Sequence, residues 1–303
     1  MIDKAHKDTD KIIEEIEKEL KYNYQECLKL LKKELKKVTD EINAIEGEKD
    51  EIKRGVLLRR SKRLKKFINK ISNDLQKANE QAVNIVKNNS LDVYLINHDF
   101  ATYNIEIESG IDTEYNLMNR DSVKKILTKE LSPFTEMAYN GLVDKDILTR
   151  ELKRELIQSV MLGESIQKLA KRIQNVTKKN WNDSIRIART EMTRVQKSGR
   201  YDAFKRGEEL GLKLKKRWVS TLDSRTRRSH ARLMGETVGL DEKFSNGLSY
   251  PGGIGKASEV INCRCTCVAE LDYKKTDKEL KLDEKLKKMS YESWLKHHGK
   301  GRS

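Results

Sequence analysis

The first part of the chain places apolar residues among charged residues with the period of a long α-helix. Between residues 12 and 45, apolar side chains recur every three or four positions, and Lys and Glu fill most of the positions between them. This spacing predicts one continuous amphipathic helix whose apolar stripe must be covered by a partner. The stripe consists of Ile13, Ile16, Leu20, Tyr24, Cys27, Leu31, Leu35, Val38, Ile42 and Ile45.

A second apolar stripe follows a short segment that contains Gly47 and Gly55. Its members are Leu58, Leu64, Phe67, Ile68, Ile71 and Leu75. Two helical stripes separated by glycines favour a helix that folds back on its predecessor, with a parallel coiled coil as the alternative. The helical period fails around "NNSLDVYLINHDFATYNIEIESGIDTEYNLMNR", which predicts a boundary near residue 90. We therefore predict a charged helical hairpin or coiled coil over residues 1–90.

Residues 91–154 are predicted to form an irregular and helical connecting region, because Asn, Asp, Gly and Ser accumulate before helical patterns return. Further along, Leu152, Leu156, Val160 and Leu169 fall at core-facing positions of helices. The stretch from residue 181 to 211 has the pattern of a helix whose apolar face includes Met192, Val195 and Gly199. Its basic residues are expected to lie outside: Arg186, Arg194, Lys197 and Arg200.

The pattern then changes to a period of two, which is typical of strands. In "LKLKKRWVST", Leu212, Leu214 and Trp218 alternate with basic residues, and "VINCRCTCVAEL" has the composition of a second strand. "SYPGG" between them predicts a turn with Pro251 and Gly252 at its centre. Residues 155–271 are therefore expected to form a small α+β module with an antiparallel sheet, and residues 272–303 a charged helical tail. The predicted fold class is predominantly α with this C-terminal module.

Composition favours an elongated, helical molecule. Of the 303 residues, 37% are charged and 36% hydrophobic, which is a thin supply of core for this length. No apolar run approaches the roughly 18 residues that span a bilayer, and no signal-peptide pattern is present, so we expect no membrane partner. The formal net charge of +15 favours polyanionic partners such as DNA. The basic residues that could follow a phosphate backbone are Lys53, Arg54, Arg59, Arg60, Lys62, Arg63, Lys65 and Lys66.

Several separated motifs of the C-terminal module occur in a characteristic order: "IARTEMTRVQ", "KRWVSTLDSRTRRSHARLMGETV", "YPGG" and "INCRC". Together they resemble the phage head morphogenesis family, the Mu F-like minor head proteins, over about residues 155 to 270. The residues that carry the resemblance are Trp218, Asp223, Arg225, Thr226, His230, Gly235, Tyr250, Pro251, Asn262, Cys263 and Cys265. Many relatives have a His-Pro pair before the Asn-Cys-Arg-Cys run, whereas this chain has Val260 and Ile261 there.

The resemblance implies a minor capsid (head morphogenesis) protein of a tailed phage. Such a protein would be a virion component in the interior of the phage head, near the portal, and would pass through the host cytoplasm during assembly. Its implied partners are the phage portal protein, capsid or scaffold proteins, and double-stranded DNA. The implied role is binding, so no catalytic residue is expected.

Three of the four cysteines, Cys263, Cys265 and Cys267, occupy every second position of one short segment. Disulfides are disfavoured, because successive side chains on one strand face have Cα atoms about 6.5 to 7 Å apart. A zinc clip would need about four ligands. His230, Cys263 and Cys265 supply three, and Cys267 or Asp223 could be the fourth. The competing interpretation is that the thiols pack as small hydrophobes, with His230 hydrogen-bonded to Asp223 or to a carbonyl. Because Cys-x-Cys is a weaker zinc pattern than Cys-x2-Cys, packing is favoured, and no cofactor other than zinc is indicated.

Enzymatic alternatives rest on few residues. Glu106 and Glu108 resemble the paired glutamates of ADP-ribosyltransferases, but the Arg and Ser-Thr-Ser segments that precede the pair in that family have no match here. A metal-dependent nuclease could use Asp223 and His230, although no second carboxylate cluster accompanies them. A Walker-type phosphate loop does not occur in the sequence. The alternative to a binding role is thus a nucleic-acid-processing or ADP-ribosyl-transferring enzyme carried in the phage head.

Overall fold

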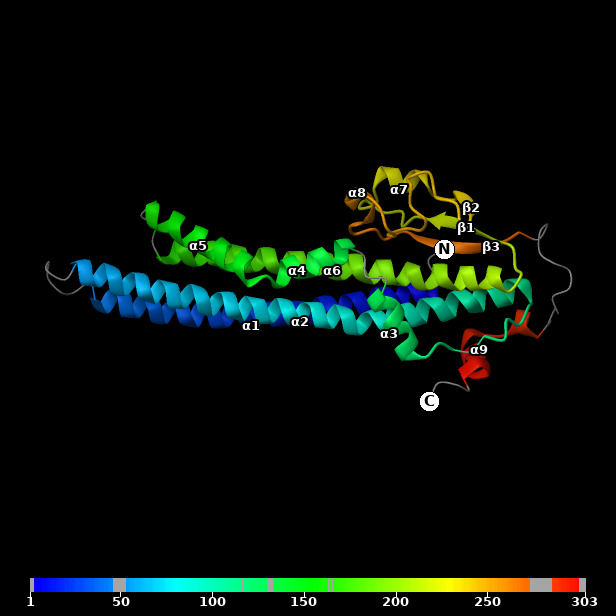
Figure 1. Cartoon of the computed structure of the whole chain (residues 1–303), viewed down its shortest axis with the longest axis horizontal. Helices are drawn as coiled ribbons and strands as arrows, with labels where there is room; N and C mark the ends of the chain where they lie inside the picture. Colours follow the sequence, from blue (N-terminus) through cyan, green and yellow to red (C-terminus); the bar gives the residue numbers. More distant parts are fainter. Residues whose placement is uncertain are drawn as a thin grey trace. The chain divides into compact units, whose positions relative to one another are not determined.

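The computed structural model describes residues 3–45, 53–115, 117–129, 133–162, 164, 166–272 and 285–299. These residues are mostly helical, with a small three-stranded antiparallel sheet near the C-terminus, as the sequence predicts (Figure 1). The elements are α1 (Lys4–Ile45), α2 (Lys53–Ser109), α3 (Arg120–Lys129), α4 (Pro133–Val143), α5 (Lys145–Met161), α6 (Ile166–Glu209), β1 (Leu214–Val219), α7 (Arg228–Arg232), β2 (Thr237–Gly239), α8 (Ala257–Val260), β3 (Thr266–Leu271), a 3-10 turn (Leu286–Lys288) and α9 (Tyr291–His298). Among the described helices, none combines the length and the apolar character that crossing a membrane requires.

The chain divides into two compact units that interleave in sequence. Unit 1 comprises Met1–Glu14, Val86–Ser132 and Ala188–Ser303, and unit 2 comprises Glu15–Ile85 and Pro133–Ile187. Helices α1, α2 and α6 each contribute one stretch to either unit. The four consecutive segments expected from the sequence remain a prediction.

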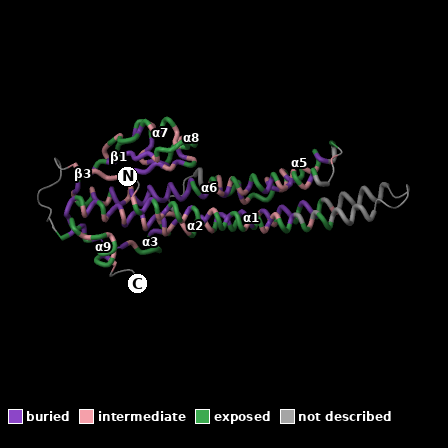
Figure 2. Tube along the Cα trace, turned by 180° about the vertical axis from the view of Figure 1, so that it is seen from behind, coloured by how far each residue is buried: buried purple, intermediate pink, exposed green. Residues whose placement is uncertain are grey.

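In unit 2, α1 and α2 form an antiparallel pair. Tyr24 donates a hydrogen bond to Asn79, and the Lys70 ammonium lies 2.8 Å from the Glu34 carboxylate. Moving ten residues forward in α1 thus corresponds to moving nine residues back in α2, which is the geometry of the predicted hairpin rather than of a parallel coiled coil. Both buried and exposed positions occur along the described stretches of the two helices (Figure 2). The side chains of Leu35, Val38, Ile42, Ile45, Leu58 and Leu64 lie outside the described residues.

The stripes of α1 and α2 pack against α5 and α6. One continuous apolar core joins Tyr24, Cys27, Leu31, Phe67, Ile68, Ile71, Leu75, Ala78, Leu148, Leu152, Leu169, Ile173 and Val176. The predicted core positions Leu152 and Leu169 are therefore confirmed, and Leu156 packs against the core while partly buried. The side chain of Val160 is outside the described residues. This core covers the apolar face that neither helix could bury alone.

In unit 1, α2 continues through residue 90 to Ser109, so the change of pattern near residue 90 does not mark a helix end. The helix persists because its buried polar side chains have partners. Asn97 donates to Thr9 Oγ1 at 2.8 Å, and Asp99 accepts from the Tyr115 hydroxyl at 2.7 Å. Paired polar residues inside a core obscure the apolar period without breaking the helix.

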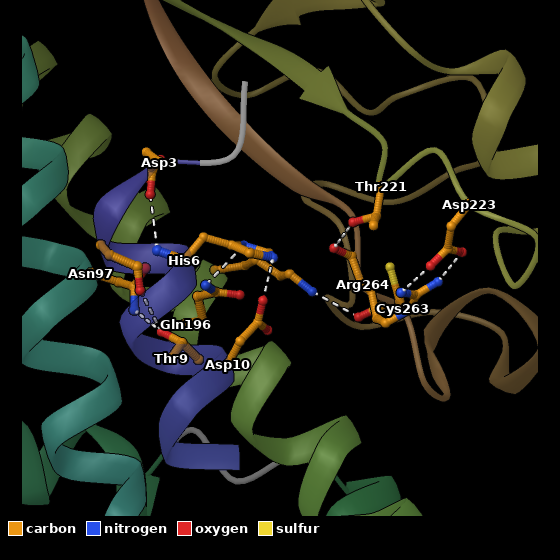
Figure 3. A network of polar contacts seen from close by, with 12 residues as sticks. Asp3, His6, Thr9, Asp10, Asn97, Gln196, Thr221, Asp223, Cys263 and Arg264 are labelled. Atoms are coloured by element: carbon orange, nitrogen blue, oxygen red, sulfur yellow. Dashed lines mark hydrogen bonds and ion pairs between the residues drawn. The ribbon is translucent and has the colours of Figure 1, made fainter. Parts of the chain in front are cut away.

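Helix α6 is buried on all sides from Thr190 to Arg200. The prediction that Arg194, Lys197 and Arg200 lie outside was wrong, since all three are at most 5% exposed, whereas Arg186 is exposed as expected. Arg200 forms a bidentate ion pair with Asp3, at 2.6 Å for both nitrogens, and also donates to Asn97. Figure 3 shows Asp3, His6, Thr9, Asn97 and Gln196 gathered in this network. Burial lowers the pKa of His6 to about 4.

The sheet has the order β2-β1-β3, with β1 antiparallel to both neighbours. Leu214, Lys216 and Trp218 of β1 are buried, in agreement with the predicted alternation, and Ala203 and Phe204 of α6 share a core with Leu214. Strand β3 begins only at Thr266. The prediction that the strand already includes "VINCRC" was therefore wrong. The turn in "YPGG" is confirmed: Gly252 has φ +74, and Gly253 N–H donates to Tyr250 O at 3.0 Å.

The C-terminal helix α9 is anchored by Trp294, as predicted for the charged tail. Trp294 is fully buried beside Tyr115 and Leu117, and its indole N–H donates to Glu106. Residues 273–284 of the predicted tail are outside the described residues.

Gly199 is required where α6 crosses α2, because a Cβ atom there would lie 2.6 Å from the Tyr94 carbonyl oxygen. Gly199→Ala must push two backbones apart, so we expect it to lower the free energy of unfolding by about 1 to 3 kcal/mol. Gly141→Ala is the matched control, because Gly141 is exposed in α4 with no atom within 4 Å of its Cβ position. This control should raise the free energy by about 0.5 to 1 kcal/mol. Urea denaturation compares the two, and equal midpoints would contradict the tight crossing.

Candidate metal centre

Three soft ligand atoms converge in unit 1. His230 comes from α7, and Cys263 and Cys265 come from the segment between α8 and β3. His230 Nδ1 lies 3.6 Å from Cys263 Sγ and 3.5 Å from Cys265 Sγ. All three residues are at most 2% exposed. We call these three residues the His–Cys cluster.

A carboxylate orients the imidazole from its other side. Glu259 of α8 places Oε2 at 2.9 Å from His230 Nε2. If Nε2 carries the proton that Glu259 accepts, Nδ1 presents its lone pair to the two sulfur atoms. Imidazoles that bind metals are commonly oriented by a carboxylate in this way.

The backbone of His230 is fixed as well. Ser220, just after β1, donates from Oγ to His230 O at 2.6 Å and accepts from the Trp218 indole N–H at 3.0 Å. The Trp218 and His230 rings meet edge to face, with centroids 5.4 Å apart. The imidazole position therefore depends on contacts from the central strand of the sheet.

Four successive residues, Ile261 to Arg264, form a loop whose backbone is held by side chains from elsewhere in unit 1. We call it the 261–264 loop. Arg227 donates to Ile261 O, and Asn262 N–H donates to Thr190 Oγ1 at 3.1 Å. Lys197 Nζ donates to Cys263 O at 2.9 Å, and Thr221 Oγ1 donates to Arg264 O at 2.8 Å. Asn262 has φ +54, a left-handed conformation that Asn tolerates better than most residues. Cys263 therefore lies in a constrained loop, and Cys265 directly follows that loop.

Asp223, a predicted ligand, is not part of the cluster. Its carboxylate forms a bidentate pair with the Arg264 guanidinium, one bond at 2.7 Å (Figure 3). Helix α7 begins only at Arg228, and Asp223 accepts from the Arg225 N–H at 2.9 Å in a turn. The hydrogen bond from Arg264, despite desolvation, lowers the pKa of Asp223. Its oxygens are thereby committed to an exposed ion pair.

Cys267, the other candidate for a fourth ligand, belongs to a different core. It is fully buried with Ala101, Ala203 and Leu214, whereas Cys263 and Cys265 pack with Trp218. Burial raises the pKa of the Cys267 thiol to about 11, so it remains protonated. The regular spacing of the three cysteines thus does not bring them into one site, because only Cys267 lies on β3.

The electrostatics of the cluster favour one thiolate. A hydrogen bond from Cys265 lowers the pKa of Cys263 well below its usual value, against the effect of burial, and Lys197 and His230 add to the shift. The same hydrogen bond, together with burial, raises the pKa of Cys265. Burial acts to lower the pKa of His230, but its contacts with Cys263 and Glu259 outweigh burial and raise it. Complete burial lowers the pKa of Lys197.

A second group of possible ligands, Glu106, Asp112 and His298, has a different character. The Glu106 carboxylate already accepts from the Thr113 N–H at 3.0 Å and from the Trp294 indole. It is fully buried, and these bonds make it a structural anchor for α9. Asp112 is exposed.

Sequence reasoning missed Glu259, Lys197 and Thr190. Glu259 could have been considered, because it stands four residues before Cys263 in "EVINCRC". Lys197 and Thr190 lie more than sixty residues before the loop, and no local pattern shows that their side chains reach it.

The segment that holds these residues matches a known family. Residues 150–268 match the model described as Phage Mu protein F like protein. Residues 150–268 belong to this family. The Mu F-like segment contains His230, Glu259, Cys263 and Cys265.

Similarity to two curated relatives covers more of the chain than the Mu F-like segment does. The NAD(+)--arginine ADP-ribosyltransferase EFV of Enterococcus faecalis is 32% identical over 222 residues, which cover 71% of this chain and 40% of the relative. The minor head protein GP7 of Bacillus phage SPP1 is 26% identical over 188 residues, which cover 59% of each chain. The chain thus spans about two fifths to three fifths of the length of these relatives. No solved structure matches.

Ser220→Ala tests the support behind His230. The change leaves the His230 carbonyl and the Trp218 indole N–H without their buried partner, so we expect a loss of about 1 to 3 kcal/mol in unfolding free energy. Ser245→Ala is the matched control, because Ser245 is exposed and its Oγ donates to Glu236 at 2.8 Å. The control should change stability by less than about 0.5 kcal/mol. Thermal unfolding measures both, and similar losses would refute the supporting role of Ser220.

Proposed function

We propose that this chain is a minor head protein of a tailed phage, located in the head interior near the portal after assembly in the host cytoplasm. The observation that carries the proposal is the Mu F-like segment at residues 150–268, together with similarity to the SPP1 minor head protein over 188 residues. Its partners would be the portal protein, capsid or scaffold proteins, and packaged double-stranded DNA.

The chemistry of the chain supports a binding role. All three residues of the His–Cys cluster are buried, so a substrate would not reach them without a rearrangement of the chain. Glu106 is enclosed by its own partners. Meanwhile long amphipathic helices dominate the described residues, and such helices offer extended surfaces for assembly.

DNA association is proposed for the basic segment, which we define as Lys53, Arg54, Arg59, Arg60, Lys62, Arg63, Lys65 and Lys66. The side chains of Arg63, Lys65 and Lys66 are described, and the two lysines are exposed on α2. Among the described residues neither lysine has an ion pair. Exposed lysines on a helix can approach and neutralise phosphates.

Mass spectrometry of purified procapsids and virions tests the main proposal. We expect this chain in both particles at few copies, and we expect it to co-purify with the portal protein from infected cells. Absence from both particles would refute the assignment, whatever the chain binds in isolation.

DNA binding is tested by the salt dependence of affinity. The logarithm of the binding constant should fall linearly with the logarithm of the salt concentration, with a slope of about −0.9 per phosphate contacted. Binding should show no sequence preference. Lys65→Glu with Lys66→Glu should reduce the slope by about two units if each lysine meets one phosphate. Lys18→Glu with Lys77→Glu is the matched control, because both lysines are exposed on helices and the charge change is equal. An affinity indifferent to salt, or equal effects of the two pairs, would contradict a localised DNA surface.

A second candidate function, ADP-ribosyl transfer, is favoured by one observation, the 32% identity to the Enterococcus faecalis ADP-ribosyltransferase. The full chain incubated with labelled NAD+ and an arginine-rich protein distinguishes the candidates. The binding role predicts no label transfer. Transfer that is lost on heat denaturation would establish an enzyme and overturn the purely structural assignment.

A further inference from the structure

We propose that His230, Cys263 and Cys265 bind one zinc ion, and that Glu259 positions His230 for this role. The proposal is independent of the chain's place in a phage head. It differs from the pattern expected from sequence, because Asp223 and Cys267 are excluded and Glu259 is added as the carboxylate behind the imidazole.

The separations within the cluster match the edges of a tetrahedral zinc site. Zinc bonds of about 2.3 Å to sulfur and about 2.0 to 2.1 Å to nitrogen, at tetrahedral angles, place sulfur and nitrogen about 3.6 Å apart. The observed distances from His230 Nδ1 to the sulfur atoms of Cys263 and Cys265 are 3.6 and 3.5 Å. All three ligand atoms lie within 4.8 Å of one another. A single ion can therefore contact all three atoms with little movement of the side chains.

The donor set is one that zinc prefers. Two thiolates and one imidazole are borderline-soft ligands that suit zinc, and the two negative charges neutralise the ion in a buried place. The Glu259 carboxylate at His230 Nε2 supplies the outer contact that fixes the ring and leaves Nδ1 facing the sulfur atoms. Three protein ligands leave one position of the ion for a non-protein ligand.

The His–Cys cluster lies in a part of unit 1 that has little regular secondary structure. Helix α7 has five residues, α8 four and β2 three. Between β1 and β3 the chain is therefore mostly irregular, and a metal would tie α7 to the 261–264 loop. Small folds with short elements often gain their stability from such a staple. The four side-chain contacts to the loop backbone preorganise it for this purpose.

The first test uses the full chain, reduced and stripped of metal with a chelator, and zinc chloride alone as the probe. We expect one equivalent of zinc to bind, and Cys263→Ser with Cys265→Ser to abolish binding. Cys27→Ser is the matched control, because Cys27 is a buried cysteine in the core of unit 2, and it should retain one equivalent. Zinc that fails to bind, or that binds the double variant as well as the original chain, would overturn the proposal.

The second test separates the positioning role of Glu259 from a merely structural one. Glu259→Gln should keep the one-to-one stoichiometry but weaken affinity by about 10- to 100-fold, measured by competition with a chromophoric chelator. Asp223→Asn is its control and should leave affinity unchanged, because Asp223 pairs with Arg264 instead. Equal losses in both variants would overturn the assignment of Glu259.

Cobalt(II) chloride provides a readout that does not depend on any variant folding. Cobalt bound by the unaltered chain should show the intense visible bands of a tetrahedral ion and the near-ultraviolet charge-transfer absorption of thiolate ligands, and zinc should displace it. A weak octahedral spectrum without thiolate absorption would place the metal elsewhere and overturn the proposed ligands.

Discussion

Unit 1 depends on the pairing of cations that α6 carries into a buried environment. An unpaired buried charge costs several kcal/mol, so each cation must find a partner when the helix is enclosed. Arg194 pairs with Glu191 within the helix, Lys197 donates to the Cys263 carbonyl, and Arg200 pairs with Asp3. One helix face thereby fixes both the start of α1 and the loop that presents the cysteines.

This dependence explains what could and could not be predicted from the sequence. The hairpin of α1 and α2, strand β1 and the turn at Gly252 follow from local periods and turn residues, which need no knowledge of distant contacts. The charges of α6 were misplaced because periodicity assigns charged residues to the solvent side. Only long-range partners, such as Asp3 at the far end of the sequence, make burial of Arg200 tolerable.

In the candidate site too, residue types could be recognised from the sequence, whereas long-range contacts could not. His230, Cys263 and Cys265 were identified from residue type, and the structure brings them together. Asp223 lies outside the cluster and pairs with Arg264, and Cys267 was offered as a fourth ligand because the spacing suggested one continuous strand. The left-handed Asn262 and the late start of β3 separate the cysteines into two cores. Turns of this kind are decided by contacts from α6, which no local pattern records.

The interleaving of the two units has a consequence for synthesis on the ribosome. All residues of unit 2 have been synthesised once Ile187 has been added. Unit 1, in contrast, cannot form until Ala188 and later residues have emerged to contact Met1–Glu14. Contacts such as Asp3 with Arg200 close a loop of nearly the whole preceding chain, and long loops of this kind form late. The segment Met1–Glu14 would thus be made before its partners in α6 but reach its final place only with them, so chaperones or assembly partners can meet this segment first.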